Sequence, residues 1–175
     1  MITTADQVAA YKGRVMEAIE SIKASEVGGL LAALRRVRAH GAAVYVVGNG
    51  GSYANAQHLV LHLRDVGIRA YDLMADNAWL TAESNDRAYG QAASKLLALL
   101  VRTGDIALVI SGSGCSGNII SVAGAASPNV LALLGNSGGE ALRYCSEAVV
   151  LPQTEYGPVE DAHSVVIHLL HESLK

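Results

Sequence analysis

The chain has 175 residues, of which 51% are hydrophobic, and a formal net charge of -3. Charge forms no strong local run, which argues against a nucleic-acid-binding surface. The apolar runs are all shorter than the roughly 18 residues that a membrane span requires. The polar start of the chain shows no secretory signal, and two cysteines make no disulfide framework. We therefore expect one cytoplasmic domain over residues 1–175, without a membrane or nucleic-acid partner.

The first 40 residues predict two helices, over 5–24 and 27–40, with Ser25 as the N-cap of the second and Gly41 as its C-terminal stop. Apolar strand-like runs and helical patterns alternate from there to the end, so that 43–175 forms an α/β core. The expected strands are 44–47, 68–71, 106–110, 130–134 and 148–151. The expected helices are 53–66, 77–84, 89–102, 117–126, a short one near 139–144, and 159–174.

Strands that read as near-continuous runs of Val, Ile and Leu are typical of a parallel sheet covered on both faces. The pattern therefore predicts a doubly wound α/β fold with five parallel strands. In such folds ligands bind at the carboxyl ends of the strands, near the point where the strand order reverses.

A glycine-rich loop, Gly48-Asn49-Gly50-Gly51-Ser52, lies between the first expected strand and the helix 53–66. Such a loop exposes backbone N–H groups at a helix N-terminus, where anions and phosphate above all are favoured. We interpret Asn49, Gly50, Gly51 and Ser52 as one side of a phosphate site.

A second loop, from Ser111 to Asn118, follows the third expected strand and again precedes a helix. Its serines offer hydroxyl donors and its glycines allow close approach of the backbone. The candidate phosphate-binding residues here are Ser111, Gly112, Ser113 and Ser116. Neither loop has the Gly-Lys-Ser/Thr ending of a P-loop. Gly-x-Gly-x-x-Gly does occur at 112–117, but the serines and the lack of a ribose-binding acid favour phosphate over a dinucleotide.

His58 and His62 lie about one helical turn apart, so they share a helix face. The last helix carries Glu160 and His168, eight residues apart and able to share a broad face. Together these four side chains would give the N3O ligand set that zinc favours. The alternative is that the two histidines are half-buried polar positions, and His171 and His40 are expected near solvent.

The ordered motifs of the chain resemble the sugar isomerase (SIS) domain, and more narrowly the phosphoheptose isomerase family. The resemblance spans nearly the whole chain, including the N-terminal helical pair at 1–40. It is carried by Gly48-Asn49-Gly50-Gly51-Ser52, Asn55-Ala56-Gln57-His58, Ser84-Asn85-Asp86, Ser111 to Asn118, Glu160-Asp161-Ala162-His163 and Val166-Ile167-His168.

The resemblance implies an aldose-ketose isomerase that converts sedoheptulose 7-phosphate to heptose 7-phosphate through a cis-enediol. It also implies a homotetramer with active sites between subunits, and zinc at the site. The positions that hold the sugar phosphate in the family match Ser52, Ser111, Ser113 and Ser116. The polar positions that line the sugar site match Asn49 and Asp86, and the metal-site histidines match His58 and His168.

The chain departs from the family pattern at functional positions. His62 stands where the family usually has a glutamate that serves as ligand and presumed catalytic base, and Glu160 stands where it has glutamine. We interpret this as a compensated swap in which the carboxylate moves to the last helix. Glu160 then takes the base role, with His62 and His168 as its acid partners or as ligands. Gly112 and Cys115 replace the common threonine and asparagine and could reshape the phosphate loop.

Two other functions stay open. The altered site could serve another long-chain ketose phosphate, such as an octulose 8-phosphate in an antibiotic-sugar pathway. Alternatively, the chain could be a non-catalytic SIS protein that binds a sugar phosphate or a protein partner. The histidine in place of glutamate at position 62 favours this last reading, whereas the serines and Glu160 oppose it.

Overall fold

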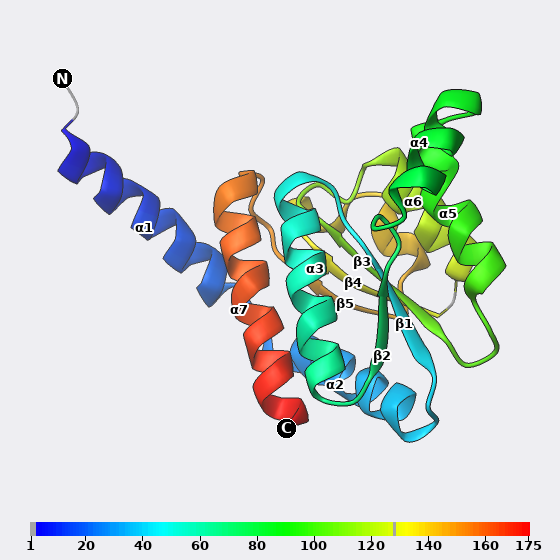
Figure 1. Ribbon diagram of the computed structural model, residues 1–175. Coiled ribbons are helices and arrows are strands. Elements are labelled where there is room, and N and C mark those ends of the chain that lie inside the picture. Colours follow the sequence, from blue (N-terminus) through cyan, green and yellow to red (C-terminus); the bar gives the residue numbers. More distant parts are fainter. Residues whose placement is uncertain (1–2, 128) are drawn as a thin grey trace.

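A computed structural model describes residues 3–127 and 129–175. Its centre is a five-stranded parallel sheet with the strand order β2-β1-β3-β4-β5. Helices cover both faces of the sheet, and the N-terminal helix extends away from it (Figure 1). The prediction of a doubly wound α/β fold is confirmed.

The strands are β1 (Ala43–Val47), β2 (Arg69–Asp72), β3 (Ile106–Ser111), β4 (Val130–Leu134) and β5 (Glu147–Val150). The helices are α1 (Thr4–Glu20), α2 (Ala24–Ala39), α3 (Gly50–Asp65), α4 (Asn77–Asp86), α5 (Tyr89–Leu100), α6 (Gly117–Ala126) and α7 (Tyr156–Leu174). Two short 3-10 helices, η1 (Asn136–Gly138) and η2 (Ala141–Tyr144), lie between β4 and β5. All five strands therefore fall within one residue of their predicted bounds.

Successive side chains of the central strands point to opposite faces of the sheet, and this divides the core into two layers. In β1, Val44 and Val46 face the layer built with α2, α3 and α7, whereas Ala43, Tyr45 and Val47 face α5 and α6. Every β1 side chain is buried because helices cover both faces of the sheet. This double burial explains why the central strands read as continuous apolar runs.

The boundary between the first two helices differs from the prediction. Ser25 lies inside α2 and is not its N-cap; the N-cap is Lys23, whose side chain makes no capping bond within the described chain. Glu26 explains the earlier start, because its carboxylate pairs with Lys23 Nζ at 2.7 Å and accepts the Val150 N–H at 3.0 Å. These bonds tie the first turn of α2 to the end of β5. The C-terminal stop at Gly41 is confirmed, with φ at +63°.

Helix α1 begins with a capping box and then leaves the body of the molecule. The Thr3 hydroxyl accepts the Asp6 N–H at 3.1 Å, while the Asp6 carboxylate accepts the Thr3 N–H at 3.2 Å. Only Ala18 of this helix is buried, and Val8 and Met16 are about half exposed. The helix projects past the start of α7 (Figure 1), so most of its surface has no partner within the described chain.

The strand order reverses between β1 and β3. The chain leaves β1 through α3 to reach β2 on one side, and then crosses back through α4 and α5 to β3 on the other. The loops after β1 and β3 consequently separate in opposite directions and leave a crevice at the carboxyl ends of these strands. Both glycine- and serine-rich loops identified in the sequence occupy this crevice.

Across residues 3–127 and 129–175, none of the helices is both long enough and apolar enough to cross a lipid bilayer.

His163 is buried on α7, with 0% of its surface exposed, and neither ring nitrogen has a hydrogen-bond partner among the described residues. Burial lowers the pKa of this imidazole to about 4. Protonation therefore favours the unfolded chain, in which the pKa is near 6.5. The stability that the neutral ring contributes is complete above that value and is lost as the pH falls towards 4.

We expect the free energy of unfolding to fall by roughly 2 kcal/mol between pH 7 and pH 5 because of this one group. His163→Leu removes the titrating ring, so its stability should depend less on pH over this window. Urea unfolding at both pH values measures the difference. His40→Gln, at an exposed histidine, is the control and should keep the wild-type pH dependence. An equally acid-sensitive His163→Leu protein would contradict the assignment.

Candidate active site

A cavity of about 420 Å³ lies in the crevice where the strand order reverses. It is lined by Asn49, Gly50, Gly51, Ser52, Ile110, Ser111, Gly112, Ser113, Ser116, Tyr156 and Glu160. All of the residues predicted to bind substrate are present except Asp86. The loops after β1 and β3 and the first turn of α7 therefore build one site.

The loop after β1 turns sharply into α3. Gly50 has φ at +55°, and a Cβ at Gly48 would overlap the backbone of Ser52. Both positions therefore require glycine. Asn49 is the N-cap residue of α3, but its side chain makes no capping bond within the described residues.

The loop after β3 is organised by the hydroxyl of Ser111, whose residue is 4% exposed. Its Oγ accepts the Gly114 N–H at 3.0 Å and the Ser113 N–H at 3.4 Å. Gly114 has φ at +63° and abuts the backbone of Gly138. The loop then enters α6, whose N-cap residue, Ser116, likewise makes no side-chain capping bond among the residues described.

Two helix N-termini therefore face one cavity without a capping side chain. The first N–H groups of a helix lack intrahelical acceptors, and the helix dipole adds positive potential at the same end. Serine hydroxyls at Ser52, Ser113 and Ser116 border these N–H groups. This arrangement favours a ligand with a multiply charged anionic group, such as a phosphate ester.

Glu160 brings a carboxylate to the wall of the cavity. The Ser52 hydroxyl donates to its Oε1 at 3.3 Å, and the carboxylate occupies the space that a Cβ on Gly51 would need. Asn55, which is 7% exposed, donates its side-chain N–H to the backbone oxygen of Glu160 at 2.9 Å. The carboxylate thus lies at the N-terminus of α3, held there by contacts between α3 and α7.

Tyr156 is a lining residue that sequence analysis missed. It begins α7, and its ring packs on Gly112, where a Cβ would lie 2.6 Å from the Tyr156 Cδ1 atom. The absence of a side chain at position 112 therefore makes room for this ring. No local motif marks Tyr156, because it is the fold that brings the start of α7 over the second loop.

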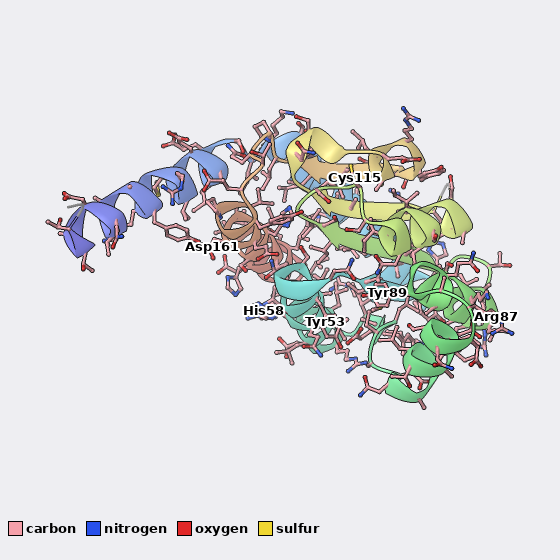
Figure 2. The ribbon with its side chains drawn as sticks, turned by 90° about the horizontal axis from the view of Figure 1, so that it is seen from above. Tyr53, His58, Arg87, Tyr89, Cys115 and Asp161 are labelled. Carbon is pink, nitrogen blue, oxygen red and sulfur yellow. The ribbon has the colours of Figure 1, made fainter. Side chains whose placement is uncertain are left out.

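Asp86 does not line the cavity. It ends α4 in an exposed position, where its carboxylate accepts a hydrogen bond from Asn85 at 2.8 Å. The buried charge of this segment is instead Glu83, which pairs with Arg87 and with Lys95. Figure 2 labels Arg87 at the right edge of the view, beside the green helices. Within one chain, the structure separates Asp86 from the other predicted substrate residues.

Three histidines meet where α3 packs on α7. The ligand nitrogens of His58, His62 and His168 all lie within 4.8 Å of one another, and the Nε2 atoms of His58 and His62 are 2.8 Å apart. Tetrahedral zinc separates two imidazole nitrogens by about 3.3 Å, so small side-chain shifts would accommodate an ion. In Figure 2 His58 lies on the side of α3 that faces α7, and Tyr89 lies on the other side.

Glu160 lies outside this histidine cluster, in contrast to the predicted four-ligand set. It contacts Ser52, whereas His168 contacts His58 and His62. Eight residues along α7 correspond to about 12 Å. The predicted set therefore divides within the chain into three clustered histidines and a separate carboxylate in the cavity.

Both His40 and His171 were expected near solvent. His40 is exposed, as predicted, but the prediction for His171 is wrong. The His171 side chain is only 11% exposed, its ring stacks on His62 with centroids 4.1 Å apart, and its Nε2 lies 2.7 Å from an Asp65 carboxylate oxygen. Sequence analysis missed this contact because it joins the ends of two helices 106 residues apart.

Burial is the main cause that lowers the pKa of both His58 and His62. The neighbouring imidazoles add to the effect, with His168 foremost for His58 and His171 foremost for His62. Lower pKa values favour neutral rings, which is the form of histidine that binds metal ions. The chemistry of the cluster thus fits a divalent transition metal.

Comparison with known proteins places this geometry in a family. The model of the SIS domain matches residues 9–135. A phosphoheptose isomerase from Geotalea daltonii is 31% identical over 171 residues, which cover 93% of this chain and 89% of the relative. One from Dechloromonas aromatica is 35% identical over 149 residues, covering 77% of this chain and 75% of the relative.

Solved structures agree with the sequence relatives. The phosphoheptose isomerase from Neisseria gonorrhoeae superposes with a TM-score of 0.92 at 27% identity, covering 98% of both chains. The enzyme from Francisella tularensis gives a TM-score of 0.90 at 28% identity, also over 98% of each chain. The chain therefore belongs to the SIS-domain family and, within it, to the phosphoheptose isomerases.

Proposed function

We propose that this protein isomerises sedoheptulose 7-phosphate to D-glycero-D-manno-heptose 7-phosphate. The names of its relatives support the reaction class. The observation that carries the proposal is a carboxylate, Glu160, at the wall of a cavity bordered by two uncapped helix N-termini. Such a cavity offers an anion site and a base to the same small molecule.

The phosphate end of the substrate would bind at the loop after β3. Ser113 and Ser116 would donate their hydroxyl groups, and the first N–H groups of α6 would supply further donors. The loop N–H groups bound to the Ser111 hydroxyl hold this backbone in shape before substrate arrives. Little conformational entropy then remains to be lost when the phosphate binds.

Glu160 would move the proton. As a base it would take the C1 proton of the ketose while a general acid protonates the C2 carbonyl oxygen, which gives a cis-enediol. The same proton would then be delivered from Glu160 to C2 while the C1 hydroxyl returns its proton to the conjugate base of that acid, which leaves a C1 aldehyde and a C2 hydroxyl. Ser52 donates to the Glu160 carboxylate and so holds it in the cavity. General acid–base groups of this kind contribute about 10²- to 10⁴-fold to a rate.

The three clustered histidines, His58, His62 and His168, would hold a zinc ion. When bound, such an ion supplies Lewis-acid polarisation of carbonyl and hydroxyl oxygens. His171 and Asp65 support this group from one side through the stack on His62. Glu160 belongs to the cavity and not to this ligand group.

We also propose a cytoplasmic homotetramer whose active sites lie between subunits. Helix α1 supports this assembly, since it projects from the body with exposed Val8, Tyr11 and Met16. The helix also contacts α7 beside the cavity, because the Tyr11 hydroxyl donates to Asp161, next to Glu160, at 2.7 Å. A neighbouring subunit would also explain why Asp86 does not reach the cavity of its own chain.

Incubation of the purified protein with sedoheptulose 7-phosphate should yield the aldose 7-phosphate, measured by chromatography with mass detection. Glu160→Gln keeps the size of the side chain but removes the base, so we expect turnover to fall by about 10²-fold or more. Glu172→Gln, at an exposed position on the same helix, is the matched control and should turn over like the wild type.

Full turnover in Glu160→Gln would disprove the base assignment. A wild type that acts on an octulose 8-phosphate instead would retain the reaction class and change the substrate. Binding of sedoheptulose 7-phosphate without any product would identify a non-catalytic sugar-phosphate-binding protein.

The metal proposal gives a separate prediction. The wild type, equilibrated with zinc and then desalted, should retain one ion per chain by elemental analysis. His58→Ala and His62→Ala should each lose most of it, because each removes a ligand. His40→Ala, at the C-cap of α2 and outside the cluster, and Glu160→Gln should both retain it. Loss of zinc in Glu160→Gln would restore the carboxylate to the ligand set, and a zinc-free wild type would contradict the metal site.

A further inference from the structure

A second cavity, of about 520 Å³, lies at the opposite edge of the sheet from the candidate active site. Its lining includes the residues directly before β1, β3 and β4, which are Ala42, Asp105 and Asn129. Figure 1 shows the end of α2 and the start of β1 at the bottom of the view, and the start of α3 at the top. Among the described residues the linings of the two cavities share no member, so this cavity is separate from the site described above.

Three arginines from different parts of the fold give this cavity a positive charge. Arg36 comes from the last turn of α2, Arg69 is the first residue of β2, and Arg102 follows α5. Asp105 is the one acidic residue among the described residues that line the cavity. Three arginines against one aspartate leave two net positive charges, in a chain whose formal net charge is -3. Positive charge is therefore concentrated in this cavity.

Asp105 supports the wall of the cavity through backbone hydrogen bonds. The residue is 6% exposed, and its Oδ1 accepts the Ala43 N–H at 2.7 Å. Its Oδ2 accepts the backbone N–H of Arg102 at 2.9 Å. These bonds tie the turn that carries Arg102 to the start of β1. Both carboxylate oxygens are thus engaged by the backbone, and the guanidinium groups remain available to a ligand.

The guanidinium groups lack acidic partners. Among residues 3–127 and 129–175, no carboxylate forms an ion pair with Arg36, Arg69 or Arg102. Arg69 donates to the backbone oxygen of Gly41, another lining residue, at 3.2 Å. Burial is the main cause that raises the pKa of Tyr45, and the charges of Arg69 and Arg102 both oppose that shift. The fields of these two cations therefore overlap, and an anion between them would lower their mutual repulsion.

The other lining residues suit a small organic anion. Val37 and Leu131 contribute apolar surface, while Thr103 and Asn129 add a hydroxyl and an amide group. A volume of about 520 Å³ lies in the range of pockets that hold small molecules. Guanidinium groups bind phosphate oxygens through pairs of N–H donors, and several of them match more than one phosphate group. A nucleic-acid strand would instead need an extended basic surface, and the sequence has no run of positive charge.

We propose that this cavity is a second ligand site, for a small organic molecule that carries two or more phosphate groups, such as a nucleoside diphosphate. Arg36, Arg69 and Arg102 hold the phosphate oxygens, and the rest of the molecule lies against the apolar part of the wall. The site uses none of the residues to which we assign phosphate binding, catalysis or metal binding. It therefore stands or falls independently of the proposed isomerase activity.

Calorimetry at fixed salt, with pyrophosphate and adenosine diphosphate as probes, tests the proposal. We expect the wild type to bind both, and adenosine diphosphate more tightly, because its organic part adds contact with the wall. Arg36→Gln and Arg102→Gln should each weaken binding by about tenfold, since each removes one charged donor. Arg143→Gln is the matched control: this arginine is exposed on η2 and lines neither cavity, so its loss should leave the affinity unchanged.

Urea unfolding accompanies each measurement. Arg36 is exposed and its side chain makes no ion pair in the described chain, so Arg36→Gln should fold like the wild type. A wild type that binds neither probe would overturn the inference, as would binding that both arginine variants retain in full. Displacement of the probes by sedoheptulose 7-phosphate would place them in the active site and also overturn it. Equal affinity for the two probes would contradict the role of the apolar wall.

Discussion

The packing of α3 against α7 is the interaction on which the site depends. The two helices follow different strands of a parallel sheet and run in the same direction, so residues meet in register along their length. Ser52 meets Glu160, Asn55 meets Ser164, His62 meets His168, and Asp65 meets His171. One helix pair thus carries a carboxylate in the cavity at its start and a cluster of imidazoles further along.

The positive potential at the cavity arises from backbone N–H groups at the N-termini of α3 and α6, which have no capping side chain among the described residues. A helix N-terminus is normally satisfied by its N-cap side chain, yet neither Asn49 nor Ser116 caps its helix within the described chain. Glu160 offsets part of the positive potential at α3. The Asn49–Asn118 pair joins the two loops across the crevice.

Much of the fold could be predicted because its signals are local. The three central strands, β1, β3 and β4, are short apolar runs, and Gly41 ends α2 with a positive φ that glycine adopts at little cost. The two loops that line the cavity were also predictable, since glycine and serine between a strand and a helix expose backbone N–H groups at a helix N-terminus. Ser25 was misassigned because Glu26 makes a tertiary bond to β5 that no local pattern reveals.

The candidate site was predictable only in part. Nine cavity residues, Glu160 among them, and three clustered histidines were named from the sequence, but periodicity on a single helix could not separate Glu160 from His168. Helical spacing gives the face on which a residue lies. It does not show which residues of a neighbouring helix lie beside it along the helix axis. The register in which α3 packs on α7 decides this, and it places Glu160 beside Ser52 at the wall of the cavity.

The sequence by itself determined the family, the parallel sheet and the two glycine- and serine-rich loops of the cavity, because each depends on short motifs of residues adjacent in the chain. The tertiary structure decided which groups act together. It placed Tyr156 over Gly112, directed Asn49 to Asn118, and divided the four predicted ligands into a cluster and a separate carboxylate. These contacts join residues 44 to 110 positions apart, and only the packing of helices on a common sheet brings them within bonding distance.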